Sequence, residues 1–99
     1  MNQRLSMAQE AAEGLAIQAL TFIAQDGERL GRFLAVTGIG PAEIRTAAHE
    51  PGFLAGVLDY VAADQRLMES FAAEAGLDPA EIDKAHHALG GGAWERDNA

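Results

Sequence analysis

The sequence predicts an all-α fold, a compact bundle of about six helices, and three observations lead to this prediction. Alanine supplies 21 and leucine 10 of the 99 residues, whereas valine and isoleucine together supply 8, a balance that favours helix over sheet. Apolar residues recur at the spacing of a helix face. Residues that end one helix and start the next divide the chain into short segments. The length suits one domain.

The chain also contains an internal repeat. When the sequence is shifted by 38 residues, positions 20–47 match positions 58–85 at 11 of 28 places without a gap. The shared string Gly-aliphatic-x-Pro-Ala-Glu-Ile does not follow from an alanine-rich composition. We therefore expect two three-helix pseudo-repeats, at about 15–49 and 53–87, within a single helical domain over 1–89.

Cap and turn residues place the elements in order along the chain. The expected helices cover about 7–25, 27–37, 41–49, 51–63, 65–75 and 79–89. Short polar side chains are expected to cap four of them, at Ser6, Asp26, Asp64 and Asp78. Gly38 and Gly76 stand where a helix C-terminus favours a left-handed residue. Pro41, Pro51 and Pro79 fit first helical turns.

The apolar stripes of these helices predict how the two pseudo-repeats meet. We expect them to pack on each other around five side chains, Phe22, Phe33, Leu54, Leu58 and Phe71. Residues 90–99 begin with three consecutive glycines and are predicted to form a flexible C-terminal tail. Trp94 in that tail could pack back on the bundle, dock on another subunit or hang free. We rank packing back first.

The charge of the chain limits its partners. Fifteen acidic residues face seven basic ones, a net charge of -8, which repels nucleic acid and anionic membranes. Residues 51–89 hold seven acids against Arg66 and Lys84. This surface could be simply solvated, or it could dock a basic partner. Cysteine is absent, which excludes disulfides and thiolate metal sites. No apolar run suits a membrane span or an export signal, so we expect a cytoplasmic protein.

One string points to phosphate contact. Residues 37–44, Thr-Gly-Ile-Gly-Pro-Ala-Glu-Ile, resemble a helix-hairpin-helix motif, in which backbone amides of a glycine turn approach a DNA phosphate. The candidate contacts are Gly38, Gly40, Arg32 and Arg45. The second copy keeps the string but places Asp78 where the first has Gly40, and a carboxylate there would repel phosphate. We rank a turn with a helix cap ahead of nucleic-acid binding.

Catalytic and metal-binding patterns are weak. His86 and His87 are adjacent, so a helix turns their side chains about 100° apart. Asp83 and His87 have metal-pair spacing, but a lone pair of this kind is usually a solvated couple. Neither Ser6 nor Ser70 lies in a nucleophile elbow, and no phosphate loop occurs. We therefore expect no enzyme activity, no cofactor and no metal.

The order of several strings resembles a known family. They are Gln18-Ala-Leu-Thr-Phe-Ile-Ala, Leu30-Gly-Arg-Phe-Leu, Thr37-Gly-Ile-Gly-Pro-Ala-Glu-Ile-Arg, and Glu50-Pro-Gly-Phe-Leu-Ala-Gly-Val-Leu-Asp59. Together they are similar to the bacterial family catalogued as domain of unknown function 3572, over about residues 8–89. The resemblance implies a small all-helical protein. It brings no established activity and no site residues.

Two functions from different classes follow as expectations. The first is a non-enzymatic helical domain that acts through protein–protein contact, with a protein partner or as a homodimer. The alternative is a helix-hairpin-helix-like module that binds nucleic acid around Gly38–Arg45. A small-ligand pocket between the two pseudo-repeats is a third option, although no residue pattern favours it.

Overall fold

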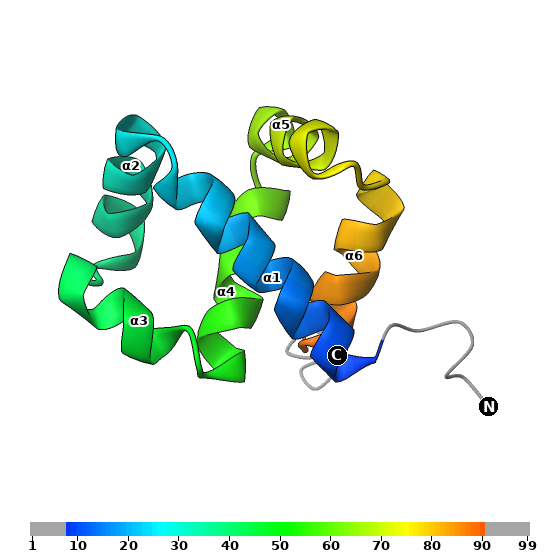
Figure 1. The fold of residues 1–99 in the computed structure, drawn as a ribbon, viewed down its shortest axis with the longest axis horizontal. Helices are drawn as coiled ribbons and strands as arrows, with labels where there is room; N and C mark the ends of the chain where they lie inside the picture. Colours follow the sequence, from blue (N-terminus) through cyan, green and yellow to red (C-terminus); the bar gives the residue numbers. More distant parts are fainter. Residues whose placement is uncertain (1–7, 91–99) are drawn as a thin grey trace, which may run out of the picture.

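The computed structural model describes residues 8–90, and every regular element in that range is helical. The elements are α1 (Gln9–Ala24), α2 (Gly27–Thr37), the 3-10 turn η2 (Pro41–Glu43), α3 (Ile44–Ala47), α4 (Pro51–Ala62), α5 (Gln65–Ala75) and α6 (Pro79–Ala88) (Figure 1). The predicted all-α fold with six helices is confirmed. The positions expected for Ser6, Trp94 and the tail 91–99 lie outside the described residues.

Aspartate side chains cap three of the helices. Asp26 Oδ1 accepts hydrogen bonds from the backbone amides of Glu28, at 2.9 Å, and Arg29, at 3.4 Å. Asp64 Oδ1 accepts from the Leu67 amide at 3.2 Å, and Asp78 Oδ1 accepts from an amide in the first turn of α6. These bonds satisfy donors that have no partner inside the helix. At α1 the N-cap position is held by Ala8, whose methyl group can accept no hydrogen bond.

Two glycines end helices in the left-handed conformation. Gly38 closes α2 with φ 74°, and Gly76 closes α5 with φ 70°. The Gly38 amide donates to the Leu34 carbonyl at 2.8 Å, so the turn satisfies a carbonyl at the helix end. Since a side chain in this conformation crowds the carbonyl that follows, both turns depend on glycine.

The third predicted helix is shorter than expected. Instead of one helix over 41–49, the chain forms the turn η2 and one turn of α-helix that ends at Ala47. Glu50 is extended, with φ -102° and ψ 122°, because the residue before a proline avoids the helical region. At the N-terminal end, Gly40 has no side chain to cap the helix. Asp78 supplies that acceptor at the equivalent place, and α6 runs for ten residues.

Helix α1 lies at the centre of the bundle. It packs against both α4 and α6, and α4 also packs against α6 (Figure 1). Helix α2 packs on α1, and α5 packs on α4. Since α1 lies directly against α6, the helices do not separate into two self-contained halves. The internal repeat stays a prediction from the sequence.

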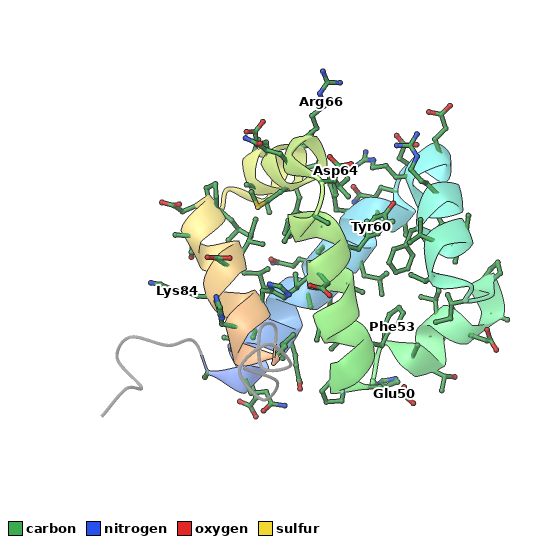
Figure 2. The ribbon with its side chains drawn as sticks, turned by 180° about the vertical axis from the view of Figure 1, so that it is seen from behind. Glu50, Phe53, Tyr60, Asp64, Arg66 and Lys84 are labelled. Carbon is green, nitrogen blue, oxygen red and sulfur yellow. The ribbon has the colours of Figure 1, made fainter. Side chains whose placement is uncertain are left out.

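The core contains all five side chains that the apolar stripes single out, Phe22, Phe33, Leu54, Leu58 and Phe71. Phe33 of α2 meets Tyr60 and Phe53 of α4 edge-on, with ring centroids 5.1 Å and 6.1 Å apart. Figure 2 shows both labelled rings pointing from α4 toward α2. Edge-to-face aromatic pairs add to the free energy of burial, so these rings attach α2 to the bundle.

Replacing Phe33 by alanine should lower the free energy of unfolding by about 3–5 kcal/mol, because it removes a fully buried ring and two aromatic contacts. Val36 of the same helix is 66% exposed, so Val36→Ala should change the free energy of unfolding by less than about 0.5 kcal/mol. Urea unfolding followed by circular dichroism measures both. Equal effects would contradict the packing described for α2.

Gly76→Ala and Gly56→Ala are the same substitution in opposite backbone settings. At Gly76 the left-handed φ should cost about 1–2 kcal/mol of stability. Gly56 lies inside α4 with open space around its Cα, so alanine there should stabilise by about 0.5–1 kcal/mol. Thermal unfolding of both variants tests this, and a stabilised Gly76→Ala protein would be inconsistent with the left-handed turn.

Candidate functional site

One groove runs along α5, opposite the bend where α1 passes into α2, and we call it the α5 groove. At one end it holds about 270 Å³ and is floored by Phe22 and Phe71, whose ring centroids lie 5.5 Å apart. Ile17 forms part of its wall and is 44% exposed. Gln18 and Thr21 of α1 and Gln25 at its C-cap add polar groups. We refer to this part as the apolar end.

The other part of the α5 groove holds about 500 Å³, and we refer to it as the arginine end. Arg29 and Arg32 line it from α2, and Arg66 lines it from α5. The remaining lining comprises Phe22, Asp64, Leu67, Ser70 and Glu74. Phe22 and Glu74 line both ends, so the two hollows adjoin at these residues, and we treat them as one groove.

Arg29 holds a fixed place at this groove. Its guanidinium carbon lies 3.9 Å from the centroid of the Phe22 ring, and its Nε lies 3.4 Å from Asp26 Oδ2. The side chain is only 29% exposed. Its Nη1 atom is buried and has no hydrogen-bond partner, which singles it out among the buried side-chain polar atoms of residues 8–90. A buried donor without an acceptor carries a free-energy cost of about 1–3 kcal/mol.

Asp26 orients Arg29 from the start of α2. Hydrogen bonds from the Glu28 and Arg29 amides to its carboxylate hold the pKa of Asp26 below its ordinary value, and the charge of Arg29 lowers that pKa further. The ionised carboxylate therefore caps α2 and pairs with the arginine that borders the groove.

The residues predicted for phosphate contact do not gather at one place. Arg32 lines the arginine end beside α5, whereas Arg45 lies on α3, at the opposite end of the molecule from α5 in Figure 1. At the glycine turn, Glu43 Oε1 accepts a hydrogen bond from the Gly40 amide at 2.9 Å. A carboxylate of the protein is thus already bonded to the amide that a phosphate would need. Glu81 closes the second turn in the same way, through the Asp78 amide at 2.9 Å.

The histidines form one contact between helices. His86 Nε2 of α6 lies 2.7 Å from Asp59 Oδ1 of α4. The ring of its neighbour His87 is 6.2 Å away from that of His86, and His87 is exposed. Within residues 8–90 no three side chains of the ligating types come together as a metal site.

Asp59 also borders a shallow hollow between α2 and α4, lined by Val36, Thr37, Gly56, Tyr60 and Ala63.

The sequence did not select Arg29 or Arg66 as site residues. It predicted Phe22 and Phe71 as core residues and not as the floor of a groove. The spacing of Arg29 and Arg32 could have been noticed, because residues three apart share one face of a helix. Arg66 comes from a separate helix, so only the tertiary structure brings it to the same groove.

No helix in the described part of the chain is long and apolar enough to cross a membrane.

The cap at Asp26 predicts a pH-dependent contribution to stability. Since the folded-state pKa is lowered, the contribution is complete above the ordinary value of 3.8 and is lost as pH falls through the lowered one. Asp26→Asn should therefore destabilise the protein at pH 7, and the difference from wild type should shrink in acid. Urea unfolding of wild type and variant, at pH 7 and again at a pH below 3.8, measures this difference. Asp83→Asn, at an exposed site on α6, is the matched control. A difference that is constant with pH would contradict the assignment.

Comparisons with known proteins place the chain in a family. No curated protein and no solved structure matches it. The family described as "Protein of unknown function (DUF3572)" matches residues 9–92, which span α1 to the end of α6. The match covers most of the chain and agrees with the resemblance carried by the sequence strings. The chain belongs to this family, DUF3572.

Proposed function

We propose that this domain is a non-enzymatic protein–protein interaction module and that the α5 groove receives its partner. The observation that carries the proposal is the apolar end, where two aromatic rings floor an open groove and Ile17 remains 44% exposed at its wall. An apolar floor inside a rim of polar residues is typical of protein-binding surfaces.

The shape of the groove supports a chain segment as its occupant. Its two ends meet at Phe22 and Glu74 and together run the length of one face of α5. An open, elongated groove bordered by helices suits a peptide or a partner helix, which can place side chains in it at intervals. A small substrate is usually enclosed on more sides.

Other expectations from the sequence remain predictions. These are cytoplasmic location, self-association and a basic partner for the acidic residues of 51–89. Nucleic-acid binding around Gly38–Arg45 also remains a prediction. The Glu43 carboxylate at the Gly40 amide does not favour it, because a phosphate would have to displace that bond. A gel-shift assay with duplex DNA at low salt tests it directly.

Site-specific photocrosslinking tests the proposed groove. A photoreactive residue at Gln18 lies in the apolar end, whereas one at Asp83 lies on the exposed side of α6. In living cells, Gln18 should yield one defined crosslinked protein that Asp83 does not yield. A crosslinked product containing two copies of this chain would assign the groove to self-association. Equal crosslinking at both positions, or none at Gln18, would refute the proposal.

The crosslinked protein should then bind the purified domain. Ile17→Ser should raise its dissociation constant roughly tenfold, because an apolar side chain no longer enters the contact. Val36→Ser makes a comparable change at the other large exposed apolar side chain of residues 8–90 and should alter the constant by less than about twofold. Both substitutions leave the charge unchanged. Isothermal titration calorimetry measures the constants, and equal effects would count against the groove.

A further inference from the structure

We infer that the arginine end of the α5 groove binds the carboxylates of an acidic partner segment, while an apolar residue of the same segment enters the apolar end. The inference rests on the proposed function and adds the chemical class of the partner. It follows from how the chain distributes its few cations.

Cations are scarce in this protein, yet they gather at the groove. The chain has a net charge of -8, and residues 8–90 contain five arginine and lysine side chains. Three of the five, Arg29, Arg32 and Arg66, line the arginine end. All three are arginines, whose planar fork binds a carboxylate through two parallel hydrogen bonds.

Each of these arginines has donors to offer. Arg29 is held in place by Phe22 and Asp26, and its buried Nη1 lacks an acceptor. Within the described part of the chain, neither Arg32 nor Arg66 pairs with a carboxylate. Figure 2 shows Arg66 standing out from the start of α5 near Asp64, so its long side chain is free to turn onto a ligand. A carboxylate that enters the groove can therefore pair with the exposed side chains of Arg32 and Arg66.

The acidic residues of the groove set the direction of the segment. Asp64 is engaged as the cap of α5, because its Oδ1 accepts the Leu67 amide. Glu74 lines both ends of the groove, so it lies where the two ends meet. A partner carboxylate is repelled there and attracted by the arginines. The acidic side chains of the segment therefore belong at the arginine end and its apolar side chain beyond Glu74.

The surrounding surface makes this preference specific. An acidic segment is repelled by most of a surface with excess negative charge and is attracted where three arginines line one groove. Repulsion outside the site together with attraction within it restricts binding to one place and one register.

Two synthetic peptides test the inference on the full chain. One carries a phenylalanine flanked by glutamates, and its twin carries lysines in their place. In ¹⁵N-labelled protein, the glutamate peptide should shift the amide signals of Phe22, Leu67 and Phe71, and the lysine peptide should not. Arg32→Glu with Arg66→Glu should raise the dissociation constant at least about tenfold. Arg45→Glu, an equal charge reversal per site on exposed α3, should raise it about twofold or less.

Several results would overturn the inference. The first is equal or tighter binding of the lysine peptide. The second is an Arg45→Glu effect on the dissociation constant as large as that of Arg32→Glu or Arg66→Glu alone. The third is the absence of amide shifts at millimolar glutamate peptide. Inorganic sulfate that reproduces the shifts at Leu67 without those at Phe71 would reassign the arginine end to a free small anion. If the crosslink at Gln18 survives the double reversal undiminished, the interaction module stands and the acidic preference fails.

Discussion

The contact between Phe22 and Phe71 connects the packing of this protein to its surface. Phe22 comes from the central helix α1 and Phe71 from α5, and both rings are buried, with centroids 5.5 Å apart. The same pair floors the apolar end of the α5 groove. The Arg29 guanidinium lies over the same Phe22 ring, 3.9 Å from its centroid. One aromatic side chain thus belongs to the core, sets the distance between α1 and α5, and positions a cation.

Packing elsewhere explains why this groove stays open. Helix α1 packs against α4 and α6 and buries three small side chains, Ala12, Ala16 and Ala19, which favour a close approach of its neighbours. The bend at Asp26 then turns the chain away from α5, and Phe33 attaches α2 to α4 instead. Helices α2 and α5 are therefore held on different parts of the bundle. The space between them is bordered by arginines and by the two aromatic rings.

Local signals made most of the fold predictable. Aspartate caps, left-handed glycines and prolines act within a few residues, so the bounds of α2, α4, α5 and α6 could be read closely from the sequence. The third helix was predicted as one element over 41–49, whereas the chain forms the turn η2 and an α3 that ends at Ala47. Gly40 offers this segment no side-chain cap, in contrast to Asp78 at the start of α6. The groove was not foreseen, because it combines Arg29 of α2 with Arg66 of α5, which only the tertiary structure brings to one place. Arg32 was selected for its closeness to the glycine turn, and the structure places it in the groove.

The glutamates at the two Pro-Ala-Glu turns have a wider consequence for recognition of negative charge. Each folds its carboxylate back onto the amide that opens its own turn, so the protein carries an internal competitor at two places where a helix start would attract an anion. Attraction of negative groups then falls to side chains on the flanks of helices. Such side chains can be exchanged one at a time without disturbing a turn, so the charge preference of this scaffold can be altered while its backbone is preserved.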